Sequence, residues 1–234
     1  REERLQHACA TPEEHCAVCA GTMIFNMGPT PAADKRAKPR LMMQLNAFLQ
    51  ALDDLLQPAK FNDYCPNGLQ VEGRAEVRTL VTGVTASEAL IDAAIALKAD
   101  AILVHHGYFW KGERAEIIGM KRRRIGKLIS HDLSLLAYHL PLDAHPTLGN
   151  NAQLAQRLGF ARESSLFPQD PRVVGDVGTL VPAMTADALS QRIEEVLGRK
   201  PLHIAGSDKL IQRVAWCTGG AQGFIEQAIA MGVD

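Results

Sequence analysis

The sequence predicts an α/β protein made of two lobes with mostly parallel sheets. Short apolar runs that suit buried strands alternate along the chain with amphipathic segments of helical period. Residues 101–104 are apolar without alternation, which is typical of a strand covered on both faces, as in a parallel sheet. Together these patterns indicate layers of helices packed on strands.

The elements of the first lobe follow from periodicity and from residues that begin or end helices. Ser87 is a predicted N-cap, and Gly159 is expected to end a helix. In order we expect a helix from Leu45 that ends before Pro58, a turn-rich loop over 63–73, a strand over 77–85, a helix over 88–98, a strand over 101–104, a helix over 119–130, a strand over 133–138 and a helix over 150–158.

The second lobe is predicted in the same way. Its expected elements are a strand over 177–181, a helix capped by Thr185 that runs to Leu197 and ends at Gly198, short strands over 202–205 and 214–217, and a helix over about 222–230. The boundary between the lobes is expected within residues 163–172. The lobes therefore comprise residues 42–165, with the His-His motif, and 166–234.

An internal similarity bears on the second lobe. Residues 91–100 resemble residues 225–234, and each stretch follows a strand rich in Val, Thr and Gly. In the first copy a strand and two histidines come next, whereas the second copy ends at Asp234. We therefore expect the second lobe to be incomplete at its C-terminus. Generic alanine-rich amphipathicity is the alternative explanation.

Residues 1–41 are expected to be a disordered or non-native leader. They contain few large aliphatic side chains and several prolines, so they can bury little apolar surface. Met42 or Met43 is the more natural start. Cys16 and Cys19 have C-x-x-C spacing, which leaves a zinc site with neighbouring His and Cys residues as an alternative.

Composition narrows the function class. The chain has 234 residues, 47% of them hydrophobic, and a formal net charge of −1, so electrostatics gives no case for nucleic acid. No apolar stretch approaches the roughly 18 residues of a membrane span. Five unevenly spaced cysteines argue against a secreted disulfide scaffold, and a cytoplasmic location is expected.

His105 and His106 are the most informative residues. They lie where a buried strand gives way to Gly107, and ligands of open α/β sheets gather at the carboxyl ends of strands. Successive residues of an extended chain point in opposite directions. The pair therefore converges on one ion only where the chain bends, and suits two neighbouring ions equally well.

A second polar cluster follows the next buried strand, over residues 138–146. Asp143 is the best carboxylate there, and two imidazoles with one carboxylate suit zinc, iron or manganese. Pro141 is expected to keep the segment extended, so that no helix hides Asp143. A turn or cap role for Asp143 stays open. His139 and His145 are weaker candidates, either as groups that orient ligands or as surface histidines.

Several motifs together resemble the NIF-three-like family, also called GTP cyclohydrolase I type 2 homologues. The resemblance spans about residues 43–234. The motifs are Asn67-Gly68-Leu69-Gln70, Leu103-Val104-His105-His106-Gly107, Tyr138-His139-Leu140-Pro141-Leu142-Asp143-Ala144-His145, Gly149-Asn150-Asn151 and Cys217-Thr218-Gly219-Gly220-Ala221.

The resemblance implies a fold, a cofactor and an assembly. Family members hold two divalent metal ions (Zn, Fe, Mn or Mg) between two similar α/β lobes and assemble as toroidal homo-hexamers. His105, His106 and Asp143 match metal ligands of the family. Its remaining ligands, a His and a Glu in a Gly-His-x-x-x-Glu motif, have no match in this chain, and we expect them beyond Asp234.

The implied function is a dinuclear-metal-dependent hydrolase that acts on a nucleotide or purine-like small molecule through a metal-bound water. His139 and His145 are the candidates for a proton donor. The alternative is a metal-binding scaffold or regulatory adaptor without catalytic turnover.

Three further motifs each carry two interpretations. Residues 217–222 suggest an anion cradle or a close packing turn, and we favour the turn. The basic run 121–124 suggests a nucleic-acid contact or a solvated helix face, and we favour the solvated face. The aromatic run 108–110 suggests base stacking or packing, and packing is the simpler expectation.

Overall fold

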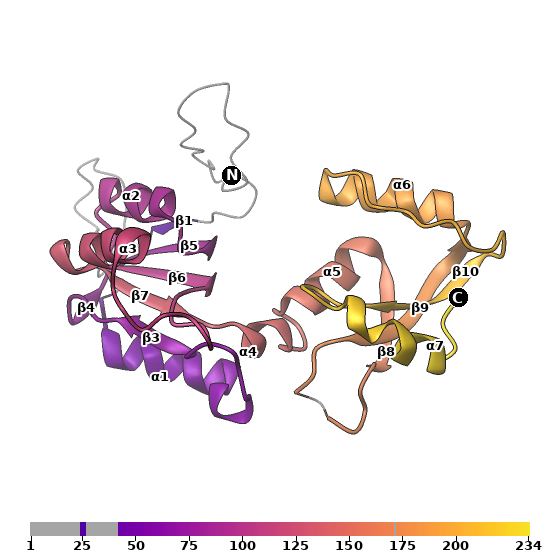
Figure 1. The fold of residues 1–234 in the computed structure, drawn as a ribbon, viewed down its shortest axis with the longest axis horizontal. Helices are drawn as coiled ribbons and strands as arrows, with labels where there is room; N and C mark the ends of the chain where they lie inside the picture. The colour runs from indigo at the N-terminus through magenta and orange to yellow at the C-terminus, as the bar shows by residue number, and fades with distance from the viewer. Residues whose placement is uncertain (1–23, 27–41, 171) are drawn as a thin grey trace, which may run out of the picture. The chain divides into compact units, whose positions relative to one another are not determined.

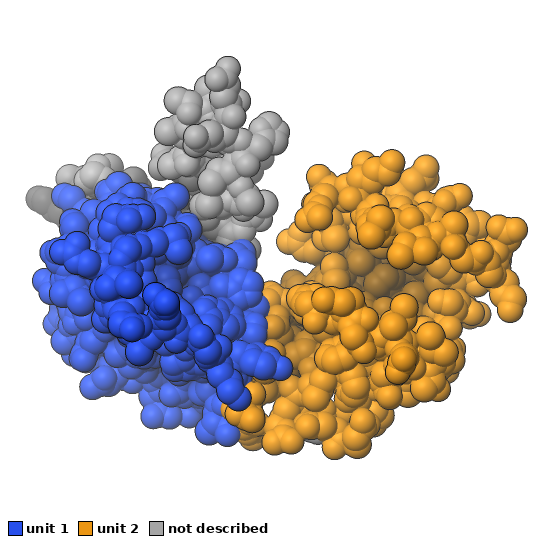
Figure 2. Space-filling view, viewed as in Figure 1, with its two compact units in different colours: residues 1–59, 63–139 blue, residues 60–62, 140–234 orange. Residues whose placement is uncertain are grey.

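The computed structural model describes residues 24–26, 42–170 and 172–234. Contacts divide the chain into two compact units, coloured separately in Figure 2. Among the described residues, the first unit comprises those up to Ala59 together with Asp63–His139, and the second comprises Lys60–Asn62 and Leu140–Asp234.

A five-stranded sheet forms the first unit, in the order β1-β5-β6-β7-β3. Strands β5, β6 and β7 are parallel, while β1 and β3 pair antiparallel at the two edges. The strands are β1 (Ile24–Asn26), β3 (Gly68–Val71), β5 (Thr79–Thr85), β6 (Ala101–His106) and β7 (Ser134–Ala137); β2 (Met43–Gln44) and β4 (Glu76–Val77) form a separate antiparallel pair. The predicted α/β class and the parallel centre of this sheet are confirmed.

Helices cover both faces of this sheet. Figure 1 shows α2 (Glu88–Ala96) and α3 (Gly119–Ser130) on one side and α1 (Leu45–Leu56) on the other. Leu90 of α2 and Leu128 of α3 are fully buried in one core with Ile102 of β6. This burial explains why the strand reads as a continuous apolar run. The Ser87 hydroxyl accepts a hydrogen bond from the backbone N–H of Leu90, so the predicted N-cap is confirmed.

The second unit contains a three-stranded sheet in the order β10-β9-β8, antiparallel throughout. Its elements are α4 (Leu140–Asp143), α5 (Asn150–Leu158), β8 (Phe160–Ser165), β9 (Asp176–Met184), α6 (Ala186–Leu197), β10 (Ile211–Trp216), a 3-10 turn (Gln222–Phe224) and α7 (Ile225–Ala230). Leu180, Val214 and Trp216 form its core with Ala155 of α5. The expected parallel sheet therefore does not extend to this unit.

The structure corrects four expectations. The units divide after His139, earlier than residues 163–172, because residues 160–165 form β8 and pair with β9. The loop predicted over 63–73 contains β3, which pairs with β7. Residues 202–205 form no strand, and Leu202 is 91% exposed, so an apolar pattern there has no sheet partner. The C-terminal helix starts as a 3-10 turn and becomes α-helical only at Ile225.

The expected leader is described only in part. Residues 24–26 form β1, paired antiparallel with residues 79–81 of β5, so the disorder predicted for 1–41 is wrong for these three. The rest of the leader, with the alternative zinc site at Cys16 and Cys19, lies outside the described residues. No helix in the described ranges combines the length and apolar character that a bilayer crossing requires.

Candidate metal centre

The carboxyl ends of two neighbouring parallel strands bring the histidines together. His105 and His106 are the last two residues of β6. His139 lies just beyond the end of β7, separated from it only by Tyr138. Because β6 and β7 are parallel and adjacent, both strands deliver their side chains to the same edge of the sheet. The strand-end position predicted for the His pair is therefore confirmed.

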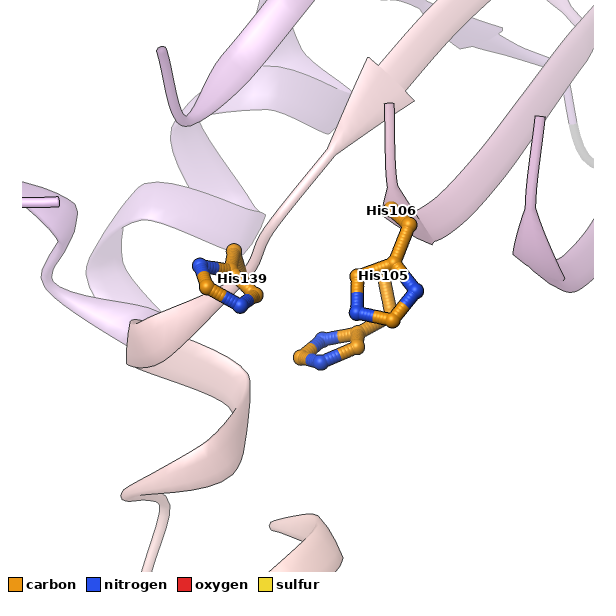
Figure 3. A group of neighbouring side chains, drawn as sticks. All are labelled: His105, His106 and His139. Carbon is orange, nitrogen blue, oxygen red and sulfur yellow. The ribbon is translucent and has the colours of Figure 1, made fainter. Parts of the chain in front are cut away.

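Three imidazoles converge at this edge, as Figure 3 shows. One ring nitrogen from each of His105, His106 and His139 lies within 4.8 Å of the others. The ring centroids of His105 and His106 are 4.4 Å apart, and that of His139 is 4.9 Å and 5.6 Å from them. The rings of two adjacent residues at the end of the strand thus converge. Such a group of nitrogen ligands could hold a metal ion.

A backbone contact orients His105. Its Nδ1 lies 3.1 Å from the carbonyl oxygen of Tyr138. A carbonyl only accepts, so Nδ1 carries the proton and Nε2 presents its lone pair. Metal-ligating histidines characteristically donate their second ring N–H in this way. The chemistry of this donor therefore fits a metal ligand.

His139 is held by the loop before β3. Its Nδ1 lies 2.7 Å from Oδ1 of Asp63, whose side chain is only 3% exposed. Its backbone N–H donates to Oδ1 of Asn67 at 2.7 Å, and Nδ2 of Asn67 donates to Oδ2 of Asp63 at 2.9 Å. Two residues from one loop thus hold both the backbone and the ring of His139.

The turn after His106 is held by Gln70 from β3, just beyond that loop. The backbone N–H of Tyr108 donates to Oε1 of Gln70 at 2.7 Å, and Nε2 of Gln70 donates to the Tyr108 carbonyl at 3.1 Å. A Cβ at Gly107 would collide with Oε1 of Gln70, which is why glycine is required here. The Asn67-Gly68-Leu69-Gln70 motif therefore braces both histidine segments.

The aromatic run after Gly107 contributes one ring to the site. The Trp110 ring stands edge-on to His139 with centroids 5.0 Å apart, and its centroid is 5.8 Å from that of His106. Tyr108 is buried in the core, and its hydroxyl donates to the Ala86 carbonyl at 2.7 Å. Packing, as expected, accounts for Tyr108, whereas Trp110 forms one wall beside the imidazoles.

Cys65 lies beside this group. Asp63, Cys65 and His139 also place three ligand atoms within 4.8 Å of one another. Burial, reinforced by the negative charge of Asp63, raises the pKa of the Cys65 thiol from 9.0 to about 11. A thiol must lose its proton to bind a metal. Metal binding by Asp63, Cys65 and His139 would therefore have to displace the thiol proton.

Asp143 lies in the second unit and is 6% exposed. Its Oδ1 accepts hydrogen bonds from Nδ2 of Asn150 at 2.8 Å and from the Thr218 hydroxyl at 3.5 Å. The expectation that Pro141 keeps this segment extended is wrong. Residues 140–143 form the short helix α4, because proline is well tolerated in the first turn of a helix. As a metal ligand, Asp143 stays a prediction.

His145 serves a local turn. Its Nδ1 accepts the backbone N–H groups of Leu148 at 3.1 Å and Thr147 at 3.3 Å. One ring nitrogen is therefore committed to backbone capping. Of the two histidines predicted as proton donors, His139 is the one that the structure places beside His105 and His106.

The remaining motifs have ordinary roles. In the basic run, Arg123 lies 3.7 Å from Glu88, and Lys121 pairs with Glu113 at 3.2 Å. The solvated face expected for this run is wrong for Lys121, whose side chain is only 12% exposed and whose Nζ lies 4.9 Å from the centre of the Phe109 ring. In the 217–222 segment, the Thr218 N–H donates to Oδ1 of Asn151 at 2.9 Å, and Gly219 has φ +96°. This segment is a turn bonded to helix α5.

Sequence reasoning missed Asp63, Asn67 and Gln70 as parts of the site. In the sequence, Asn67 and Gln70 indicate only the family resemblance, and Asp63 falls within a predicted loop. Their partners lie far along the chain, 76 residues away for the contact of Asp63 with His139. One sequence signal could have found them. Their polar side chains are grouped in a predicted loop that is also suited to pair with the buried strand.

The fold and this edge define an α/β protein with a candidate metal centre at the carboxyl ends of its central strands. The chain belongs to the Duf34/NIF3 (NGG1p interacting factor 3) family, whose sequence model matches residues 43–234.

Similar proteins agree with this placement. Proteins named GTP cyclohydrolase 1 type 2 homolog from Pseudomonas aeruginosa and Vibrio cholerae are 53% and 58% identical over 194 residues. These matches cover 83% and 82% of this chain and 77% and 75% of the relatives. A solved structure titled protein ybgI, unknown function, is 49% identical with a TM-score of 0.77, covering 82% of this chain and 76% of that one. The protein TTHA1606 from Thermus thermophilus is 32% identical with a TM-score of 0.67, covering 79% and 74%.

Proposed function

We propose that this protein is a dinuclear-metal-dependent hydrolase that acts on a nucleotide or purine-like small molecule. The observation that carries the proposal is the convergence of His105, His106 and His139 at one sheet edge. The printed name of the relatives, GTP cyclohydrolase 1 type 2 homolog, supports a purine nucleotide as the substrate class.

The ligands we assign are His105 and His106, with Asp143 as the carboxylate. Imidazole nitrogens and a carboxylate suit Zn, Fe or Mn, while Mg would rely more on oxygen ligands. Two divalent ions held there would supply Lewis-acid activation of water and substrate. Their place between the two lobes stays a prediction.

We assign His139 as the group that moves a proton. Hydrolytic opening of a purine ring needs a base that takes a proton from water and an acid that returns one to the leaving nitrogen. Nε2 of His139 faces the other two imidazoles, and Asp63 at Nδ1 would stabilise the ring when it is charged. The same geometry would also let His139 serve as a third nitrogen ligand.

The test combines metal analysis with turnover. The protein is stripped with a chelator, reloaded separately with Zn, Fe, Mn or Mg, and assayed for GTP ring opening. We expect turnover only in a metal-loaded form, and loss of both metal and turnover after His105→Ala and His106→Ala. His131→Ala is the matched control, because this histidine is exposed at the end of α3 and away from the strand ends. Full turnover in both site variants would overturn the proposal.

His139→Gln separates the two roles of this residue. If His139 moves a proton, the variant keeps its metal content and loses turnover. If it is a ligand, the metal content falls as well. Full turnover in His139→Gln would contradict both roles.

The second candidate function is a metal-binding scaffold or regulatory adaptor. The family description, NGG1p interacting factor 3, favours it because it names an interaction rather than a reaction. An adaptor would keep metal that stabilises the fold and show no turnover with any metal. Thermal unfolding with and without chelator, beside the GTP assay, distinguishes the two functions.

Assembly and location complete the proposal. We propose a homo-hexamer, as the family resemblance implies, and a cytoplasmic location, as the irregular cysteine pattern suggests. Light scattering of the purified chain at several concentrations would measure the assembly. A monomer at every concentration would contradict the hexamer.

A further inference from the structure

We propose that Asp63 is a positioning residue that fixes His139 in its Nδ1–H tautomer, so that Nε2 faces His105 and His106. Asn67 holds Asp63 in place for this role. The inference deepens the proposed function. It rests on that function only for the role of Nε2 of His139, which is proton transfer or metal binding. The geometry that carries it lies entirely within the first unit.

The orientation of Asn67 is the first step. Oxygen and nitrogen of an amide are distinguished by their partners. The backbone N–H of His139 can only donate, so the Asn67 atom 2.7 Å from it is the oxygen. The other end of the amide is then the NH₂ group, which donates to Oδ2 of Asp63 at 2.9 Å.

The proton on His139 is the second step. Asp63 accepts from Nδ2 of Asn67 on one oxygen and from the Tyr64 backbone N–H, at 2.6 Å, on the other. A carboxylate is an acceptor only. The ring atom 2.7 Å from Oδ1 of Asp63 must therefore be the donor, which places the proton on Nδ1 of His139.

The direction of Nε2 is the third step. The backbone of His139 is bonded to Asn67 and its ring to Asp63, so neither can turn without breaking a hydrogen bond between largely buried groups. Figure 3 shows one ring nitrogen of His139 directed toward His105 and His106. Asp63 acts through this ring and does not itself belong to the three-imidazole group.

The competing use of His139 is a metal group with Asp63 and Cys65. That group would require a thiolate at Cys65 and loss of the bond between Asp63 and Nδ1 of His139. The positioning role keeps every hydrogen bond of the loop intact.

The test reads the tautomer directly. The full chain is labelled with ¹⁵N-histidine, and long-range ¹H–¹⁵N correlation spectra are recorded at mildly alkaline pH without added metal. The His139 signals are assigned from their absence in His139→Gln. We expect the Nδ1–H pattern in the wild type and its replacement by a mixture containing the Nε2–H form in Asp63→Asn, since the amide replaces one acceptor oxygen with a donor. An unchanged Nδ1–H pattern in Asp63→Asn would overturn the inference.

Asp100→Asn is the matched control. Asp100 is also a buried carboxylate of the first unit, but it lies before β6, at the opposite end of the strand, and binds Arg74 at 2.9 Å. We expect this variant to lose stability and to keep the His139 tautomer. A changed tautomer in Asp100→Asn would mean that loss of stability alone moves the ring, and would also overturn the inference.

A second variant protects the test against failure to fold. Asn67→Ala leaves Asp63 in place and removes its support, so we expect a partial loss of the Nδ1–H form. If GTP turnover is found, Asp63→Asn should lower kcat by about 10²–10⁴-fold with little change in KM. If no turnover is ever found, the proposed function fails, whereas the tautomer measurement still decides the positioning role.

Discussion

Nδ1 of His105 lies 3.1 Å from the backbone carbonyl oxygen of Tyr138, so the segment after β7 orients a histidine that ends β6. The acceptor is main chain, and no side-chain substitution at Tyr138 removes it. The orientation of His105 is therefore a property of the parallel pairing of β6 with β7. His139, in contrast, depends on a side chain, the carboxylate of Asp63.

Tyr138→Phe should lower stability without altering the candidate metal centre. The fully buried Tyr138 donates its hydroxyl to Oδ1 of Asp53 in α1 at 2.7 Å. Loss of this bond should cost about 1 kcal/mol of unfolding free energy, measured by urea denaturation. Tyr64→Phe, at a tyrosine that is 61% exposed, should change it by less than about 0.5 kcal/mol. A larger effect at Tyr64 than at Tyr138 would contradict the prediction.

Gly107→Ala should destabilise the turn after the His pair. The added Cβ would collide with Oε1 of Gln70 and approach Cβ of Ala137 at 2.7 Å. We expect a loss of about 1–3 kcal/mol in unfolding free energy, together with weaker metal binding. Gly126→Ala is the control, because this glycine of α3 has nothing within 4 Å of the added Cβ. That change should stabilise the helix by about 0.5–1 kcal/mol. Equal effects of the two substitutions would refute the prediction.

Ser87→Ala should remove the N-cap of α2. The Ser87 hydroxyl accepts the Leu90 N–H at 3.2 Å, and loss of such a cap costs about 1 kcal/mol. Ser190→Ala is the control, because Ser190 lies inside helix α6 and not at a capping position. This change should leave the unfolding free energy nearly unaltered. Urea denaturation of both variants checks the prediction, which fails if Ser87→Ala unfolds at the wild-type midpoint.

Stability should fall as the pH rises from 9 toward 11. Burial raises the pKa of Cys65 from 9.0 to about 11, so in this window the unfolded chain releases a proton that the folded chain retains. Stability rises with pH only where the unfolded state binds more protons, and here it binds fewer. Cys65→Ala should show a flatter decline in unfolding free energy over the same range. Parallel declines in the two proteins would show that Cys65 does not contribute.

Local sequence signals predict the helices whose ends are marked by specific residues, such as a capping hydroxyl or a terminal glycine. Helix α6 begins after Thr185, whose hydroxyl accepts the Ala188 N–H, and ends at Gly198, where φ is +65°. Strand β6 was predicted because its apolar run is uninterrupted. Strands β3 and β8 were missed, because each lies at the edge of a sheet and is defined by its pairing partner rather than by its own pattern.

The candidate site was predictable to the extent that it obeys the rule for strand ends. That rule predicts a site at His105 and His106 and in the segment after the next strand, which contains His139. It could not show that Asp63 contacts His139, because a hydrogen bond between residues 76 positions apart leaves no local periodicity. Nor could it identify α4, where Pro141 is accommodated in a short helical turn.

The division of the chain after His139 has a consequence for biosynthesis. All three imidazoles, with Asp63 and Asn67, belong to the unit that the ribosome completes first, and His139 is its final residue. Domains generally fold as units, with the N-terminal one folding first during synthesis. The three imidazoles are therefore expected to come together while the second unit is still being translated. A metal ion that binds these imidazoles would then meet them before the second unit has folded around Asp143.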